Sequence, residues 1–147
     1  MKKLALALIA HDSKKEDMIS LVKAHREELT AIELFATRNT GQVIQSNTKL
    51  TVTLMQSGPK GGDQQIGALV ANGDVKAVIF LRDPLMAQPH EPDITVLLRV
   101  CDVHDVPLAT NIVTAEAVLH LIFENPEALG GHHIVAQYLE DMAAVHN

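Results

Sequence analysis

Aromatic side chains are scarce in this sequence of 147 residues, which has no Trp, one Tyr and three Phe. Proteins that bind nucleic acids usually combine stacking aromatic rings with a basic surface. The formal net charge here is −6 at pH 7, so the chain also lacks the excess of Lys and Arg that a phosphate backbone attracts. We therefore expect no nucleic-acid partner. A small anion is not excluded, because backbone amides and a few local cations can bind it.

Cysteine and long apolar runs are equally rare. The single cysteine, Cys101, cannot form a disulfide within the chain. The N-terminal apolar run, residues 4–10, stops at His11 and is not followed by a cleavage site of the signal-peptide kind. No run approaches the ~20 apolar residues that a membrane-spanning helix needs. We expect a cytoplasmic protein with no membrane contact.

Blocks of like charge, low-complexity tracts and linkers rich in Ser or Pro are also missing. The composition, 47% hydrophobic and 20% charged, is that of an ordinary globular protein. A chain of this length can bury a hydrophobic core without disulfides or a structural metal. We expect one domain over residues 1–147.

Short apolar runs alternate with amphipathic segments along the chain. Five runs have the length of strands: Leu4–Ala10, Ala31–Ala36, Thr51–Met55, Ala77–Leu81 and Val106–Thr110. Apolar residues at helical spacing predict four helices: Glu16–Leu29, Asp63–Asn72, Asp93–Asp105 and Thr114–Glu124. The segment Ile134–Ala144 fits either a helix or a strand. The alternation predicts a three-layer, Rossmann-like (flavodoxin-like) α/β fold, a mostly parallel sheet with helices on both faces.

Polar residues follow each predicted strand at its carboxyl end. In open α/β sheets, ligands bind outside this edge, where loops pass into helices. The functional residues are therefore expected on one rim of the sheet. The segments concerned are His11 to Lys15, Thr37 to Gly41, Ser57 to Asp63, Asp83 to Asp93, and Asn111.

The glycine-rich segment from Ser57 to Asp63 has two interpretations. It can be a tight turn in which Asp63 caps the following helix. Alternatively, its glycines let backbone amides approach a phosphate or an oxyanion at the positive end of that helix. The segment is not a Walker loop, because no Gly-Lys-Ser/Thr ends it.

Two further clusters have equally ordinary alternatives. Asp12 or Ser13 can cap the helix after the first strand. The loop after the second strand, residues 37–41, can place Thr40 as the cap of a short helix. However, the hydroxyls, Asn39 and Arg38 of this loop would also hold a phosphate group well.

The segment from Asp83 to Asp93 contains three prolines and is the least ordinary of the clusters. Asp93 can be the N-cap of the following helix. A stiff loop that carries His90 and Asp93 also holds an acid and a base close together at little entropic cost. A metal site built from Asp83, His90 and Asp93 is less favoured, because no His-x-x-x-His or Cys-x-x-Cys pair supports it.

Taken together, these motifs resemble the methylglyoxal synthase family over most of the chain. The resemblance runs through Leu4–Asp12, Phe35-Ala-Thr37, Ser57-Gly-Pro-x-Gly-Gly-Asp63-Gln-Gln-Ile-Gly, Phe80-x-x-Asp83-Pro-Leu-x-Ala-x-Pro-His90-x-Pro-Asp93, Leu97-Leu-Arg99 and Ala109-Thr-Asn111. It implies a lyase that converts dihydroxyacetone phosphate to methylglyoxal and inorganic phosphate with no metal or organic cofactor. It also implies a homohexamer that phosphate inhibits allosterically.

The resemblance implies a role for each matching residue. Asp63 is the expected base, and His90 and Asp93 are its partners in proton transfer, with His11 on the same rim. The residues expected to hold the phosphate are Lys15, Thr37, Thr40, Ser57 and Gly58, together with His11 and Asn39.

The chain departs from the family at three places. Family members commonly read Thr-Gly-Thr-Thr where this chain has Thr37-Arg38-Asn39-Thr40, so an amide replaces one hydroxyl and Arg38 adds a cation. Lys60 is a further added cation in the glycine loop. The C-terminal tail lacks an arginine that the family often carries and that is implicated in contacts between subunits.

Two other functions are compatible with the same fold. The large subunit of carbamoyl-phosphate synthetase contains a domain of similar fold that binds effectors without catalysis. An isomerase acting on the same triose phosphate would share the proton-transfer residues but leave the phosphate ester intact. Retention of Asp63, His90 and Asp93 together favours an enzyme, because binding phosphate requires none of them.

Overall fold

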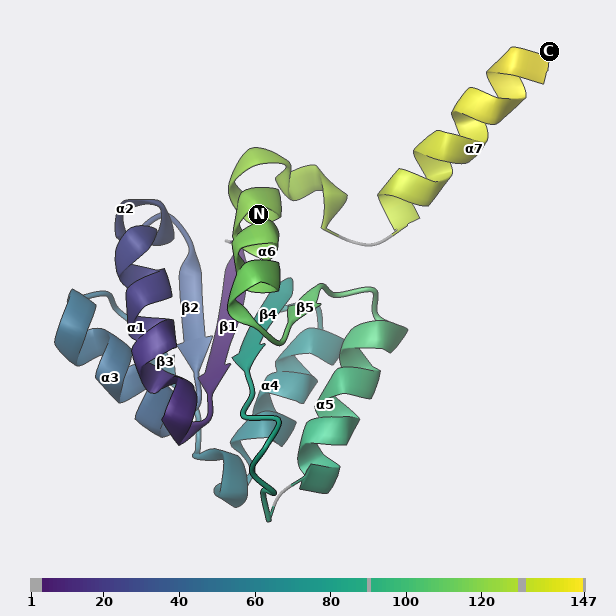
Figure 1. Cartoon of the computed structure of the whole chain (residues 1–147). Coiled ribbons are helices and arrows are strands. Elements are labelled where there is room, and N and C mark those ends of the chain that lie inside the picture. Colours follow the sequence, from purple (N-terminus) through teal and green to yellow (C-terminus); the bar gives the residue numbers. More distant parts are fainter. Residues whose placement is uncertain (1–3, 90, 130–131, 147) are drawn as a thin grey trace.

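The fold is a parallel sheet of five strands between two layers of helices (Figure 1). The computed structural model describes residues 4–89, 91–129 and 132–146. The strand order is β3-β2-β1-β4-β5, and each paired neighbour is parallel. The strands are β1 (Ala5–Ala10), β2 (Glu33–Ala36), β3 (Thr53–Leu54), β4 (Ala77–Leu81) and β5 (Leu108–Ala109). The predicted fold class is confirmed, and the order is the Rossmann order rather than the 2-1-3-4-5 order of flavodoxin.

The central strands β1 and β4 are buried at every residue, as expected for strands covered on both faces. Successive side chains of a strand point to opposite faces. Leu6 and Leu8 therefore pack with α1 (Lys15–Ala24), α3 (Arg38–Thr48) and α6 (Ile112–Glu124). Ala7 and Ile9 pack on the other face, with α4 (Gly62–Ala71) and α5 (Glu91–Val103).

The chain reverses its direction of winding between β1 and β4. From β1 it builds outward through β2 to β3, and it then returns to add β4 and β5 on the other side of β1. The loops after β1 and β4 thus leave the sheet in opposite directions and open a crevice between them. This switch point is where open α/β sheets bind ligands.

Helix α3 is the element that the sequence predicted least well, because it suggested only a short helix capped by Thr40. Residues 37–41 were expected to form a loop, but the helix begins at Arg38, directly after the extended Thr37. Its buried face contains Thr40, Gly41 and Ile44 rather than a run of large apolar residues, so the helical periodicity is weak. A Cβ atom at Gly41 would lie 2.2 Å from Leu54 Cδ2, so a larger residue there would force the Leu54 side chain to move.

Other boundaries shift by a few residues. The helix predicted over Glu16–Leu29 divides at His25 into α1 and α2 (Arg26–Leu29). His25 Nε2 is 2.9 Å from Glu116 Oε1 of α6, which ties this break to the neighbouring helix. Helices α5 and α6 begin two residues earlier than predicted. Asn111 caps α6, because its Oδ1 accepts a hydrogen bond from Thr114 N at 3.0 Å.

The C-terminal segment is a helix, α7 (His132–His146), which follows the short turn η3 (Pro126–Ala128). This settles the choice that the sequence left open. Figure 1 shows α7 projecting away from the sheet and its covering helices. Its side chains from Tyr138 to Val145 are exposed. Within the described parts of the chain, no helix combines the length and apolarity needed to cross a bilayer.

Candidate active site

A cavity of about 450 Å³ opens at the carboxyl edge of the sheet, beside the crevice between β1 and β4. Its walls come from the ends of β1 and β4 and from the loops that follow β1, β2, β3 and β4. Seven of the ten residues predicted as site residues line it: His11, Lys15, Thr37, Asn39, Thr40, Ser57 and Gly58. These residues lie in three segments of the sequence and are brought together by the parallel sheet.

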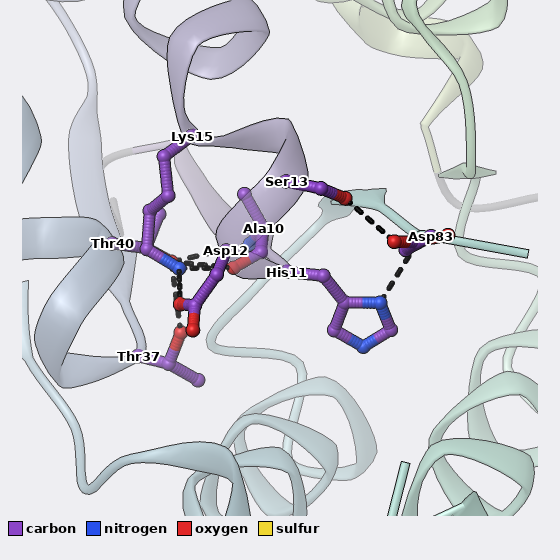
Figure 2. A network of polar contacts seen from close by, with 8 residues as sticks. All are labelled: Ala10, His11, Asp12, Ser13, Lys15, Thr37, Thr40 and Asp83. Carbon is purple, nitrogen blue, oxygen red and sulfur yellow. Dashed lines mark hydrogen bonds and ion pairs between the residues drawn. The ribbon is translucent and has the colours of Figure 1, made fainter. Parts of the chain in front are cut away.

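A polar network forms one wall of the cavity (Figure 2). The Lys15 ammonium donates hydrogen bonds to Ala10 O at 2.5 Å and to Asp12 Oδ1 at 3.3 Å. Thr40 Oγ1 accepts from Ala10 N at 3.2 Å and donates to Ala10 O at 3.3 Å, and Thr37 donates to Thr40 at 3.3 Å. The cation and two hydroxyls thus surround the last residue of β1.

Thr40 is not the helix cap that the sequence suggested as an alternative. It lies in the first turn of α3 and is 1% exposed, and Thr37 occupies the N-cap position. The hydroxyl of Thr40 joins α3 to β1, because it bonds both main-chain groups of Ala10. Its position therefore has a structural reason in addition to the predicted role in holding phosphate.

The glycine loop forms a second wall. Ser57 precedes the short turn η2 (Gly58–Lys60), and its carbonyl accepts from Gly62 N at 2.9 Å. Gly61 adopts the left-handed conformation with φ 99° and is the N-cap of α4. Gly62 must be glycine, because a Cβ atom there would lie 2.0 Å from Gln56 O. The loop is thus folded tightly against the start of α4.

Asp63 is the second residue of α4 and is 1% exposed, so it is not the helix cap that the turn interpretation required. A carboxylate is rarely buried this completely in a protein. It is not among the residues that line the cavity, but the start of its helix is hydrogen-bonded to the lining residue Ser57. It lies in the first turn of α4, at the positive end of the helix dipole.

The ring of His11 bridges the ends of the two central strands. Its Nδ1 accepts a hydrogen bond from Asp83 N at 2.8 Å, and His11 N donates to Leu81 O at 3.1 Å. The ring lies edge-on to Phe80, with centroids 5.2 Å apart and planes at 82°. A main-chain N–H can only donate, so Nδ1 is the acceptor and the neutral ring carries its proton on Nε2.

Asp12 and Ser13 do not cap a helix as the sequence suggested. They belong to the single turn η1 (Asp12–Lys14), whose N-cap residue is His11, and no side chain makes a capping bond there. Ser13 instead donates its hydroxyl hydrogen to Asp83 Oδ2 at 2.8 Å. This bond lowers the pKa of the Asp83 carboxyl below its ordinary value, with help from Leu85 N and the nearby Lys14.

Asp93 lies in the first turn of α5, which begins at Glu91, so it is not the N-cap either. Its Oδ1 accepts a hydrogen bond from Gln64 Nε2 at 3.0 Å, which links α5 to the residue after Asp63. Asp93 does not line the cavity. The predicted residue His90 lies outside the described residues. In the part of the chain that is described, no group of three or more His, Cys, Asp or Glu residues could hold a metal ion.

The two added cations, Arg38 and Lys60, are exposed and are not among the lining residues. Several lining residues were not predicted as site residues, among them Ser13, Asp83 and Gln88. The sequence placed Ser13 and Asp83 on the same rim, but their contact joins positions 70 residues apart. No local pattern identifies such a pair.

Comparison with known proteins gives one consistent result. The family profile described as "MGS-like domain" matches residues 17–110. The chain is 62% identical to the methylglyoxal synthase of Carboxydothermus hydrogenoformans over 119 residues, which cover 81% of this chain and 98% of the relative. It is 56% identical to that of Oceanobacillus iheyensis over 115 residues, 78% of this chain and 82% of the relative. The crystal structure of methylglyoxal synthase from Elizabethkingia anophelis NUHP1 superposes with a TM-score of 0.75 at 38% identity, covering 88% of this chain and 82% of that one.

Proposed function

Since the chain belongs to the methylglyoxal synthase family, we propose that it converts dihydroxyacetone phosphate to methylglyoxal and inorganic phosphate at the cavity beside β1. The observation that carries this proposal is the convergence of seven predicted residues from three sequence segments on that one cavity. Its volume of about 450 Å³ is ample for a three-carbon phosphate ester.

The chemistry determines which proton must be removed. Phosphate can leave only if its C–O bond lies next to the π system that forms. The base therefore takes a proton from the hydroxyl-bearing carbon, and the electron pair forms an enediolate with the carbonyl carbon. The enediolate then expels phosphate from the other carbon, which leaves the enol of methylglyoxal. Protonation of that enol at its terminal carbon gives methylglyoxal, so all atoms of the substrate appear in the two products.

We assign the first step to Asp63. A general base must be held close to the carbon that it deprotonates, and positioned proton transfer contributes about 10²–10⁴-fold to a rate. Asp63 is buried in the first turn of α4, directly after the glycine loop, so its side chain has little freedom to move. Removal from water also makes a carboxylate a more effective base than in solution.

The enediolate oxygen requires a hydrogen-bond donor. His11 Nε2–H is suited to that role because Nδ1 is engaged with Asp83 N and cannot carry the proton. His90 and Asp93, which the family resemblance implies, are proposed to move protons between the substrate oxygens. The bond from Gln64 to Asp93 supports a fixed place for that carboxylate.

The phosphate group is proposed to lie against Lys15, Thr37, Asn39, Ser57 and Gly58. Lys15 supplies positive charge and is only 17% exposed, so its attraction is screened less than that of a surface lysine. The first-turn amides of α3 and the N-terminal dipole of that helix add to this field. A firm hold on the phosphate keeps the C–O bond in the alignment that elimination needs.

The deciding experiment incubates chelator-treated protein with dihydroxyacetone phosphate and quantifies methylglyoxal and free phosphate together. Equal release of both is expected. A phosphorylated aldehyde without free phosphate would instead identify an isomerase. Phosphate binding without turnover would point to an effector-binding domain of the carbamoyl-phosphate synthetase kind.

We further propose a homohexamer that phosphate inhibits allosterically, as the family resemblance implies. Sedimentation equilibrium with and without phosphate tests the subunit number, and initial rates at several phosphate concentrations test the inhibition. A monomer whose rate follows simple competition by phosphate would contradict both parts.

A further inference from the structure

A hydrogen bond between Ser13 and Asp83 joins the two loops that leave the sheet at its switch point. Ser13 Oγ donates to Asp83 Oδ2 at 2.8 Å, and Leu85 N donates to Asp83 Oδ1 at 3.0 Å. Each oxygen of the carboxylate is therefore held by its own donor. Figure 2 shows Asp83 joined by dashed lines to Ser13 and to the ring of His11.

The same residue controls the ring of His11 through its main chain. Asp83 N donates to His11 Nδ1 at 2.8 Å. If this N–H turned away, Nδ1 could carry the ring proton and Nε2 would become an acceptor. The tautomer that donates from Nε2 therefore depends on the orientation of the Asp83 peptide group.

The other contacts of His11 fix its place but do not choose between tautomers. His11 N is held by Leu81 O at 3.1 Å, and the edge-on contact with Phe80 restricts the ring plane. The Asp83 peptide begins a turn with exposed residues at Pro84 and Leu85, so packing does not restrain that side of the loop. The hydrogen bonds from Ser13 Oγ and Leu85 N to the Asp83 carboxylate are the contacts that restrain this side of the loop.

We infer that Ser13 is a positioning residue for the reaction proposed above. Its hydroxyl holds the Asp83 side chain, the Asp83 N–H thereby stays on His11 Nδ1, and His11 Nε2 keeps the proton that the proposed reaction donates to the enediolate oxygen. This inference rests on the proposed function for its catalytic consequence. Its structural part, the control of the His11 tautomer, does not depend on turnover.

If the Ser13–Asp83 hydrogen bond only stabilised the fold, its removal would change the free energy of unfolding and not the His11 tautomer. Ser13 is exposed, and exposed hydrogen bonds contribute little to the free energy of unfolding. Loss of the bond should therefore leave stability nearly unchanged while it changes the tautomer and the chemical step. Stability alone cannot test the inference, and a spectroscopic readout is needed.

The test compares Ser13→Ala with Ser13→Thr, which keeps the hydroxyl, and with Thr30→Ala. Thr30, at the end of α2, is a matched control, because its exposed hydroxyl donates to the nearby Glu27 O and neither residue lines the cavity. The measurements are kcat, KM and the ¹⁵N chemical shifts of the His11 ring nitrogens, assigned with a His11→Gln variant.

For Ser13→Ala we expect kcat to fall about tenfold with little change in KM, less than the roughly 10²–10³-fold cost of deleting an oxyanion donor. The ¹⁵N shifts should change from a single Nε2–H tautomer to a mixture of both. Ser13→Thr should restore both properties, and Thr30→Ala should match the wild type.

Two results would overturn the inference. One is a Ser13→Ala protein that keeps the wild-type kcat and the single tautomer. The other is equal impairment of Ser13→Ala and Ser13→Thr, which would show that the hydroxyl is not the cause. If the wild-type protein releases no methylglyoxal, the proposed function fails, but the ¹⁵N shifts still decide whether Ser13 sets the tautomer.

Discussion

At the scale of single residues, Asp63 combines two properties that rarely occur together. It is a carboxylate, and it is 1% exposed. Burial of a charge is costly unless the surroundings compensate for it. The N-terminal turn of α4 offers partial compensation through its dipole. Such a costly arrangement is characteristic of residues retained for chemistry.

The substitution Asp63→Asn removes the proposed base but keeps the size of the side chain. We expect kcat to fall by about 10²-fold or more, because an amide cannot accept the substrate proton. Phosphate binding and the circular dichroism spectrum should stay close to those of the wild type. Asp102→Asn, which changes an exposed carboxylate on α5, is the control. Substantial activity in the Asp63→Asn protein would assign the base to another residue.

The Asp83 carboxyl offers a test by titration. The hydrogen bond from Ser13 is the largest cause of its lowered pKa. A lowered pKa means that the ionised carboxylate adds a small contribution to stability at pH values above the ordinary carboxyl range. This contribution disappears as the pH falls through the lowered pKa. In a ¹³C titration, we expect the Asp83 midpoint to lie below the ordinary value and to rise in Ser13→Ala. An identical midpoint in both proteins would mean that the bond does not form in solution.

At the scale of elements, the glycine loop and α4 act as one unit. Gly61 needs the left-handed conformation, and Gly62 packs where a Cβ atom would collide with the main chain of Gln56. The backbone conformation of Gly61 and the packing of Gly62 are sufficient to explain these two glycines, and no bound ligand is needed for that explanation. Because Asp63 follows directly, the packing of Gly62 also fixes the position of the proposed base.

The substitution Gly62→Ala tests this coupling. A contact of 2.0 Å to a carbonyl oxygen cannot be relieved by rotation of a side chain, so the start of α4 must shift. We expect a loss of about 1–3 kcal/mol in the free energy of unfolding and a large fall in kcat. Gly67→Ala lies in the same helix, α4, and its added Cβ atom would meet Leu97 Cδ1 of α5 at an ordinary contact distance of 3.9 Å. This control should be neutral or stabilising by about 0.5–1 kcal/mol. Equal unfolding midpoints in the two variants would contradict the packing argument.

At the scale of the whole molecule, the sheet divides the core into two clusters that depend on each other. Alternate residues of β1 and β4 belong to opposite clusters. Detachment of either helical layer from the sheet would therefore expose apolar side chains of the central strands to water. Cys101 is fully buried in the layer formed by α4 and α5. Its thiol therefore reports the opening of that layer.

Burial raises the pKa of the Cys101 thiol to about 11. At pH 8 a group with this pKa has about a hundredth of the thiolate of an ordinary thiol, and only the thiolate reacts rapidly. We expect iodoacetamide to leave Cys101 unmodified in the native protein and to modify it in urea across the same transition as the loss of helix. Fast labelling without denaturant would show that the layer of α4 and α5 opens locally.

Several features follow from the sequence alone, because they depend on local spacing. Continuous apolar runs such as Ala77–Leu81 predict buried parallel strands, and helical periodicity predicts α4, α5 and α6 to within two residues. The topology rule then places His11, Lys15 and Ser57 on one edge. The motifs around Asp63 identify the family without any structure.

The features that only the tertiary structure decided involve contacts between distant segments. Helix α3 escapes local prediction because its buried face consists of small and hydroxylated residues that fit against β1 and β3. Thr40 and Ser13 both look like helix caps in the sequence, yet their hydroxyls bond to Ala10 and Asp83 on other elements. A hydroxyl can form a hydrogen bond with any suitable group that the fold brings within reach. Its role therefore depends on tertiary packing rather than on its neighbours in the chain. The sequence therefore determined which residues meet at the rim, and the folded packing determined what each of them does there.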